Sequence, residues 1–200
     1  TSWEPASAGL TSTDVQALVV DPRDGTLFAG TSSLSGGSGG VFRSRDGGTS
    51  WEPASAGLEL TSTYVQALVV DPRDGALFAG TSSLFGGGVF RSRDGGASWE
   101  PASAGLTSTD VLALIVDPRD GTLFAGTSSL SGGGVFRSRD GGTSWEPASA
   151  GLTSTDVQAL VVDPRDGTLF AGTSSLSGGS GGVFRSRDGG TSWEPASAGL

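Results

Sequence analysis

The side chains that could do chemistry in this sequence are carboxylates and guanidinium groups. There are 21 acidic residues, and the 12 cationic residues are all arginines; Lys, His and Cys are missing. Without His, the commonest acid/base residue and metal ligand at neutral pH is absent. Without Cys, there are no disulfides, thiolate zinc sites or thiol nucleophiles. Any site must therefore use carboxylates, arginines or the single tyrosine.

Acidic residues recur at two kinds of position. Asp21 and Asp24 with their copies lack the alternating acidic spacing of an EF-hand calcium loop, and the sequence Asp-Pro-Arg-Asp-Gly predicts a turn. Asp14, Asp110 and Asp156 precede apolar segments and could form a ring that attracts cations. We interpret that ring as a solvated polar rim. No metal site and no cofactor are therefore predicted.

The formal net charge is −9, which argues against a nucleic acid or an anionic membrane as partner. No apolar run approaches the ~20 residues that span a bilayer, and no signal peptide is visible. The sequence starts inside a repeat without Met, as expected for a processed, excised or designed segment or a window of a longer array. Absent Cys fits any redox compartment, the extracellular space included.

Five tryptophans, spaced 48, 48, 46 and 48 residues apart, set the organisation of the chain. The repeats run over 11–60, 61–106, 107–152 and 153–200, and 1–10 is a partial copy. Within the first repeat, apolar segments bounded by Gly, Pro and Asp predict short strands over 15–20, 26–31, 41–44 and 50–54. The proline in the last of them predicts an edge strand.

Four short antiparallel strands in each repeat of about 45 residues are typical of a β-propeller blade. No segment has the 3.6-residue period of a helix, which excludes a helical solenoid. We predict an all-β, single-unit β-propeller over 1–200. It has four near-identical four-stranded antiparallel blades, and 1–10 supplies one extra outer strand for ring closure or swapping.

One turn motif recurs in every repeat with the pattern Ser-x-Asp-x-Gly-x-x-Trp. Its residues are Ser44, Asp46, Gly48, Trp51; Ser92, Asp94, Gly96, Trp99; Ser138, Asp140, Gly142, Trp145; and Ser186, Asp188, Gly190, Trp193. The motif resembles the Asp-box, or BNR repeat, of sialidase, sortilin-type and photosystem-assembly-factor-like propellers. The resemblance covers essentially the whole chain.

The residues of the motif have a structural explanation that needs no ligand. Asp46 can accept hydrogen bonds from turn amides, and Ser44 can tie the strand end to the turn. Gly48 tolerates left-handed backbone, and Trp51 can bury its ring between blades. The resemblance implies the same role, because Asp-boxes lie at the blade periphery, away from the active site.

The resemblance to sialidases implies an arginine triad, an Asp acid and a Tyr–Glu nucleophile pair. Arginines recur in every repeat, at Arg43 and Arg45 and their copies, whereas a triad needs single residues converging from different blades. We expect salt bridges between these arginines and Glu52 and its copies. The only tyrosine is Tyr64, and the nearby Glu59 lies in a predicted loop.

Departures from the repeat mark a second candidate site. Tyr64 replaces an Asp, Phe85 replaces a Ser, and Glu59-Leu60 is an insertion. The alternation of hairpins places these changes on one face of the propeller. We expect Tyr64 and Phe85 to form an aromatic patch that could stack on a sugar or a peptide, unless the changes are neutral drift in loops.

Four blades could close tightly, or two chains could form an eight-bladed ring, which the bulky Phe and Trp of every blade favour. The segments 1–10 and 191–200 would compete for one edge position, which also allows strand-swapped assembly. The expected partner is thus the chain itself, and a glycan or a peptide is an additional candidate.

The predicted function is a non-catalytic propeller scaffold or interaction protein, not an enzyme. The alternative is lectin-like carbohydrate binding at repeated inter-blade sites, and a remote alternative is a sialidase-like glycoside hydrolase. The near-identical repeats indicate either recent natural amplification or engineering.

Overall fold

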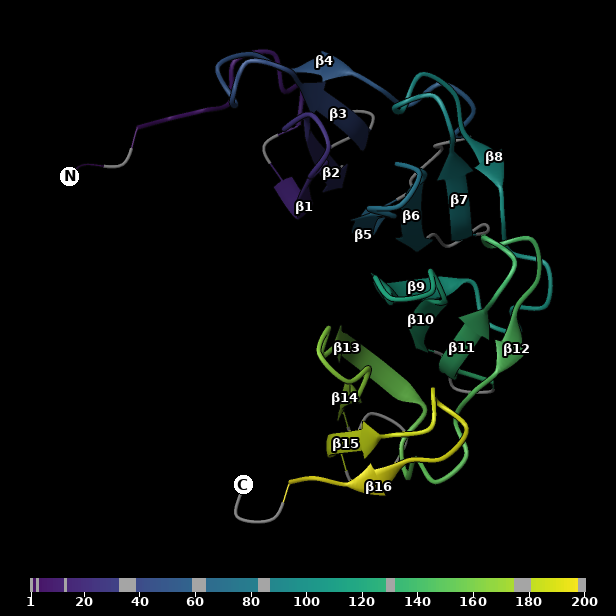
Figure 1. Cartoon of the computed structure of the whole chain (residues 1–200). Coiled ribbons are helices and arrows are strands. Elements are labelled where there is room, and N and C mark those ends of the chain that lie inside the picture. Colours follow the sequence, from purple (N-terminus) through teal and green to yellow (C-terminus); the bar gives the residue numbers. More distant parts are fainter. Residues whose placement is uncertain are drawn as a thin grey trace.

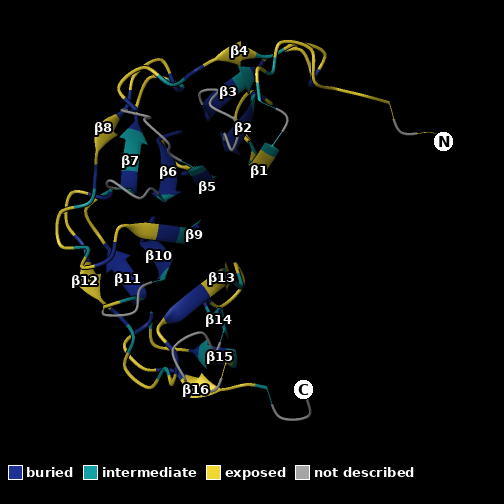
Figure 2. Cartoon of the chain, turned by 180° about the vertical axis from the view of Figure 1, so that it is seen from behind, coloured by how far each residue is buried: buried dark blue, intermediate teal, exposed yellow. Residues whose placement is uncertain are grey.

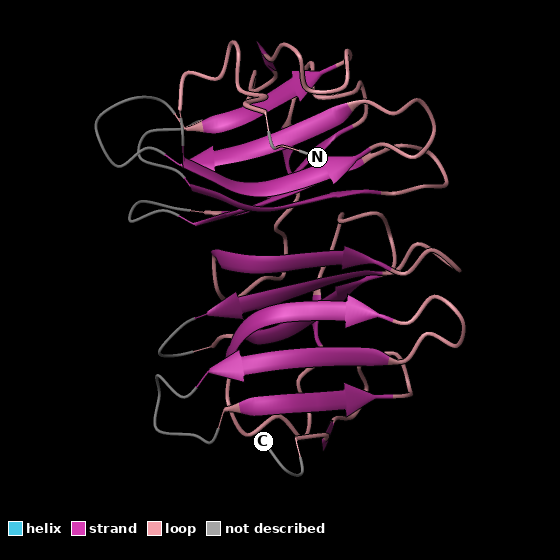
Figure 3. Cartoon of the chain, turned by 90° about the vertical axis from the view of Figure 1, so that its left-hand side faces the viewer, coloured by secondary structure: helices cyan, strands magenta, loops and turns pink. Residues whose placement is uncertain are grey.

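The computed structural model describes residues 2, 4–12, 14–32, 39–58, 64–82, 87–128, 132–174 and 181–197. Within these ranges every regular element is a strand (Figures 1 and 3). The described residues contain no helix that is long and apolar enough to cross a membrane. The predicted all-β β-propeller with four blades is confirmed. Three residues at which the sequence departs from the repeat, Phe85, Glu59 and Leu60, lie outside the described residues.

Each repeat forms one four-stranded antiparallel sheet with its strands in sequence order. In blade 1 these are β1 (Asp14–Val20), β2 (Leu27–Ser32), β3 (Gly40–Ser44) and β4 (Glu52–Pro53). In blade 2 they are β5 (Tyr64–Val70), β6 (Leu77–Ser82), β7 (Gly88–Ser92) and β8 (Glu100–Pro101). In blade 3 they are β9 (Asp110–Val116), β10 (Leu123–Ser128), β11 (Gly134–Ser138) and β12 (Glu146–Pro147). In blade 4 they are β13 (Asp156–Val162), β14 (Leu169–Ser174), β15 (Gly182–Ser186) and β16 (Glu194–Pro195).

The outermost strand of each blade has only two residues, because a proline cannot donate to a ladder and confines the strand to a sheet edge. Pro53 pairs with Phe42, and Glu52 pairs with Arg43. The chain then leaves the strand but stays bonded to the blade, since Ala54 N donates to Val41 O at 2.8 Å. In blades 1, 2 and 3 this outer part ends in a tail, 54–58 in blade 1, that reaches the following blade.

The blades follow one another along an open arc, with the inner strands β1, β5, β9 and β13 facing its concave side (Figure 1). Each blade packs on the next: β1 and β2 contact β5, β5 and β6 contact β9, and β9 and β10 contact β13. The first and last blades lie at opposite ends of the arc, and their described residues do not contact each other (Figure 1). A single chain therefore does not close the ring.

The hydrophobic core lies between blades rather than within them. Phe28 and Val41 of blade 1 form one buried cluster with Val65, Leu68 and other residues of blade 2. Equivalent clusters join blades 2 and 3 and blades 3 and 4. Burying an aliphatic side chain of this kind contributes roughly 1.5–3 kcal/mol, so each blade is stabilised mainly by its neighbours. The dark blue buried strands of Figure 2 lie where blades face each other.

A glycine in the second strand of each blade lets the next blade approach closely. A Cβ on Gly80 would lie 2.7 Å from Val111 Cγ1 and 3.2 Å from Leu114 Cδ1 of the following blade. The same position in blade 4, Gly172, has only Ala159 of its own blade nearby, at 3.6 Å. A small residue in this strand predicts close packing of one sheet on the next. That packing is present at Gly80, whereas no described residue of another blade packs against Gly172.

We expect Gly80→Ala to lower the free energy of unfolding by about 1–3 kcal/mol, because the added methyl group overpacks the contact between blades 2 and 3. Urea denaturation in dilute solution measures the change. Gly172→Ala is the matched control and is expected to stay near wild type. Equal losses in the two variants would contradict this account of the glycine.

Candidate functional site

The turn between the third and fourth strands of each blade is a closed hydrogen-bond network. In blade 1 the Ser44 hydroxyl donates to Asp46 Oδ1 at 2.8 Å and accepts from Gly48 N at 2.9 Å. Asp46 also accepts from Ser50 N at 2.9 Å and from the Ser50 hydroxyl at 2.5 Å. The same bonds recur around Asp94, Asp140 and Asp188. The aspartate is therefore occupied by its own turn.

These bonds hold the aspartates ionised. The hydroxyl and backbone N–H of Ser50, followed by the hydroxyl of Ser44, lower the pKa of Asp46 from 3.8 to about 2. The pKa values of Asp94, Asp140 and Asp188 are lowered to about 2 for the same reason. A carboxylate with so low a pKa is a poor general acid or base near neutral pH.

The tryptophan that ends each turn anchors the tail of the preceding blade. Trp99 Nε1 donates to Ala54 O at 2.8 Å, and Trp99 N donates to Ala56 O at 2.8 Å. Trp145 and Trp193 bond Ala102 and Ala148 in the same way. The rings of Trp99, Trp145 and Trp193 are buried. These three tryptophans thus lie between consecutive blades.

Trp51 makes the same contacts with the N-terminal segment. Trp51 Nε1 donates to Ala6 O at 2.9 Å, and Trp51 N donates to Ala8 O at 2.8 Å. The described residues of 1–10 form no strand and pair with no third strand. They take the place that the tail of a preceding blade takes elsewhere in the structure.

The arginines of the third strand pair with glutamate in the fourth, as the sequence predicts. Arg43 and Arg45 both bond Glu52 Oε1, at 2.7 and 2.8 Å, and hold the pKa of that carboxyl below its usual range. Arg43 also donates through Nη1 to Gly95 O of the next blade, at 2.7 Å. This second contact was not predicted; its only signal in the sequence is that the arginine recurs in every repeat.

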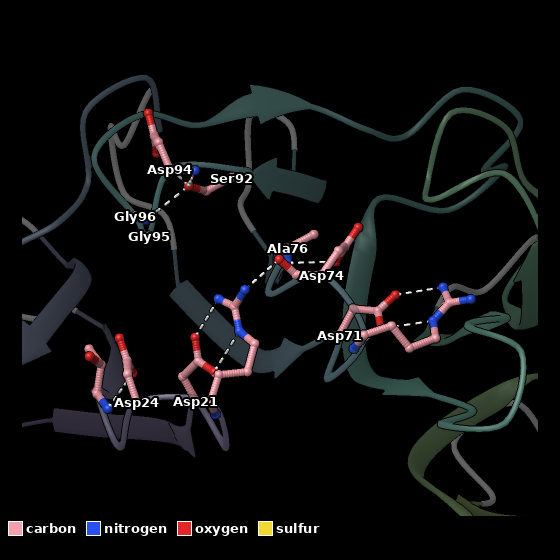
Figure 4. A network of polar contacts seen from close by, with 12 residues as sticks. Asp21, Asp24, Asp71, Asp74, Ala76, Ser92, Asp94, Gly95 and Gly96 are labelled. Carbon is pink, nitrogen blue, oxygen red and sulfur yellow. Dashed lines mark hydrogen bonds and ion pairs between the residues drawn. The ribbon is translucent and has the colours of Figure 1, made fainter.

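The turn between the first and second strands makes a similar contact to the next blade. The Asp21 carboxylate accepts from the backbone N and the side chain of Arg23, and its pKa is lowered mainly by the bonds from the Arg23 side chain. Arg23 Nη1 also donates to Asp74 O of blade 2 at 2.5 Å. Figure 4 shows the turns of Asp21–Asp24 and Asp71–Ala76 side by side. The turn predicted from Asp-Pro-Arg-Asp-Gly is confirmed.

The remaining candidates do not converge on one place. Asp14 accepts from the Ser32 hydroxyl at 2.5 Å and from Gln16 Nε2 at 2.8 Å, and Asp156 is bonded likewise by Ser174 and Gln158. Among the described residues, no three acidic side chains gather as a metal ion would require. Tyr64 is half-buried at the start of β5, opposite Ser82, and the patch with Phe85 stays a prediction.

Three hollows in the described surface lie beside the turns. Three cavities of about 260, 240 and 260 Å³ open on the third-to-fourth-strand hairpins of blades 1, 3 and 4. Each has the same six lining residues, which in blade 1 are Arg43, Arg45, Asp46, Ser50, Trp51 and Glu52. Each cavity belongs to a single hairpin at the outer edge of the arc, not to a space shared by two blades.

Comparison with known proteins shows the fold. No protein-family model and no curated protein matches the sequence. The chain is similar to a GH74 enzyme of Niastella koreensis (TM-score 0.75, 22% identity, 94% of this chain and 30% of that chain). It is also similar to a Hadza microbial sialidase (0.60, 22%, 92% and 46%) and to a chain of the nidogen/laminin complex (0.65, 16%, 93% and 62%). It spans less than two thirds of each.

The turn aspartates predict a pH dependence of stability. Because their pKa is lower in the folded chain, they stabilise it above pH ~4, and this stabilisation is lost as the pH falls toward about 2. Replacing all four, Asp46, Asp94, Asp140 and Asp188, by Asn keeps an acceptor oxygen but removes the titration. We expect denaturation midpoints of the variant to fall less than those of the wild type between pH 4 and pH 2. If the midpoints of the variant and the wild type fell equally over this pH range, the turn aspartates would not be the cause of the pH dependence.

Proposed function

We propose that the chain is a non-catalytic β-propeller with turns of the Asp-box type, acting as a scaffold for interactions. The observation that carries the proposal is the pairing of the arginines. Arg43 is held by Glu52 of its own blade and by Gly95 O of the next blade. Its copies Arg91 and Arg137 are held in the same way, each by the equivalent glutamate of its own blade and the equivalent glycine carbonyl of the following blade.

Glycoside hydrolysis needs two carboxyl groups at a set separation around one substrate bond, with different pKa values. In this chain the turn aspartates have nearly equal pKa values of about 2, and they are spread one to a blade. A repeated set of this kind lacks the asymmetry that catalysis requires. The similarity to a GH74 enzyme and a sialidase is a similarity of fold, at 22% identity.

We expect no release of fluorophore from an aryl sialoside, or from a panel of aryl glycosides, above the buffer rate. A characterised sialidase under the same conditions is the positive control. Turnover that persists through purification and disappears on changing one arginine, such as Arg91→Ala, would contradict the proposal. Turnover that survives such changes in every blade would indicate contamination.

The three hairpin cavities favour lectin-like binding as a second candidate function. Each cavity is lined by arginines and carboxylates, and the hydroxyl groups of a sugar can hydrogen-bond to such groups. Because Glu52 and Asp46 already bond the arginines and serines around them, a ligand would contact mainly atoms left exposed at the rim.

Binding of this kind predicts several equivalent sites in each chain. We expect a glycan that binds to titrate with about one site per blade in calorimetry, and to bind more weakly when Arg45, Arg139 and Arg187 are replaced by Ala. Stoichiometry of one glycan per chain would contradict binding at the hairpins and would point to a non-repeated site such as the one predicted at Tyr64.

A further inference from the structure

The interface between consecutive blades occurs three times within the chain, and each end of the arc carries one unused half of it. The leading half is presented by blades 2, 3 and 4 to the blade before them. The trailing half is presented by blades 1, 2 and 3 to the blade after them. Blade 1 therefore keeps a free leading face, and blade 4 keeps a free trailing face (Figure 1).

The leading face of blade 1 exposes apolar side chains that are buried in every other blade. Leu18 is 66% exposed and Val20 is 51% exposed. Their equivalents in blade 2, Leu68 and Val70, are only 9% and 6% exposed, because they pack against blade 1. Every large apolar side chain that is exposed in the described part of the chain lies on β1 or β13.

The trailing face of blade 4 is the complementary half. Val161 is 56% exposed, whereas its equivalent in blade 3, Ile115, packs against the cluster shared with blade 4. Phe170 is half-exposed, while its equivalent Phe124 is buried. Gly172 is open where Gly126 receives Val157 of the next blade. The equivalent of Val157 in blade 1 is Val15, which is also exposed.

The polar contacts give the two faces a direction. Arg119 donates to Asp166 O of the following blade, and Arg137 donates to Gly189 O. Their equivalents in blade 4, Arg165 and Arg185, bond only Asp163 and Glu194 of their own blade within the described residues. Arg165 is accordingly 87% exposed, compared with 45% for Arg119.

The carbonyl groups that these arginines would need are on blade 1. Asp24 O and Gly47 O of blade 1 are the equivalents of Asp166 O and Gly189 O, which accept these bonds in blade 4. Within the described residues neither carbonyl of blade 1 accepts a hydrogen bond. Apolar surface and hydrogen-bond capacity therefore match between the trailing face of blade 4 and the leading face of blade 1.

We infer that a second copy of this chain docks head to tail on the first, and that two copies close a ring of eight blades. The trailing face of each copy packs on the leading face of the other. The ring therefore contains two such interfaces, and no leading or trailing face stays free. Such heterologous contacts form a ring when the rotation closes. A ring built from copies of this chain must have a number of blades that is a multiple of four. Since one chain does not close, and propellers usually have about 4–8 blades, the expected number is eight.

The two end segments decide how the outer edge of this interface is made. Residues 1–10 and 191–200 have the same sequence, Thr-Ser-Trp-Glu-Pro-Ala-Ser-Ala-Gly-Leu. Trp51 is bound by Ala6 and Ala8 in the single chain, and Ala196 of the docked partner is the sequence equivalent of Ala6. The N-terminal segment therefore covers the outer part of the docking face and leaves Leu18 and Val20 free.

Native mass spectrometry and sedimentation at micromolar concentrations test the inference with the 200-residue chain. The expected result is twice the chain mass of 19.9 kDa, and deleting residues 1–10 is expected to keep or strengthen the pairing. A mass of one chain at all concentrations would overturn the inference. So would species that grow beyond two chains, since these would show an open polymer instead of a ring.

Variants of the free faces test which surfaces meet. Leu18→Asp changes the leading face and Val161→Asp changes the trailing face, at positions that are exposed in the single chain. Each is expected to raise the dissociation constant roughly 100-fold or more, because a carboxylate would be buried among apolar side chains. Gly172→Val, which fills the open slot without adding charge, is expected to act likewise. Ala97→Asp, exposed in a turn of blade 2, is the matched control and keeps the dimer.

Mixing the two charged variants separates head-to-tail docking from a symmetric contact. Leu18→Asp retains an intact trailing face and Val161→Asp an intact leading face, so an equal mixture can form one good interface. We expect each variant alone to be monomeric and the mixture to form heterodimers. Pairing of Val161→Asp with itself at wild-type strength, or no pairing in the mixture, would overturn the inference. Circular dichroism spectra must match the wild type for the comparison to count.

Discussion

The contact between one blade and the next is the interaction on which the whole structure depends. A blade is a single twisted sheet with apolar side chains on both faces, and it has no partner sheet of its own. Phe28 and Val41 are fully buried because residues of the following blade, among them Val65 and Leu68, cover them. The chain is thus stabilised by a row of neighbour contacts, as in other repeat proteins, where stability is a sum of unit and interface contributions.

Three layers reinforce that contact at different radii. Apolar side chains and a close-approach glycine act at the inner strands, the arginines reach carbonyl groups of the next blade, and the tryptophan holds the tail of the previous blade at the outer edge. Each layer uses residues of the repeat itself. The charged groups that a sialidase-like site would need are therefore already bonded within this scaffold, which is the physical basis for proposing a binding role rather than catalysis.

The local structure could be predicted from the sequence because short-range chemistry determines it. The segment 15–20 was expected as a strand and is β1 (Asp14–Val20), and the turn at Asp21–Gly25 follows from Pro and Gly. The proline at position 53 correctly predicted an edge strand, although that strand has only two residues. The bonds of Ser44 and Asp46 within their turn were also expected, since both partners lie within six residues.

Contacts between repeats could be predicted less well. The bonds from Arg23 and Arg43 to backbone carbonyls of the next blade depend on the angle between blades, which no residue type encodes. The same angle determines whether four blades close a ring. The sequence alone allowed both a closed ring of four blades and a ring of eight blades made by two chains. Near-identity of the repeats also hides function, because a side chain that recurs in every blade shows what the scaffold requires and not what a ligand would select.

The tryptophan anchor also constrains the order in which the chain can fold during synthesis. The tails of blades 1, 2 and 3 each dock on a tryptophan that lies more than forty residues further along, as Ala54 does on Trp99. A blade leaving the ribosome therefore cannot complete its outer edge until the next repeat has been translated. Folding must follow translation with a lag of about one repeat. In that interval the unfinished edge can be captured by a neighbouring nascent chain, because identical repeats offer identical partners.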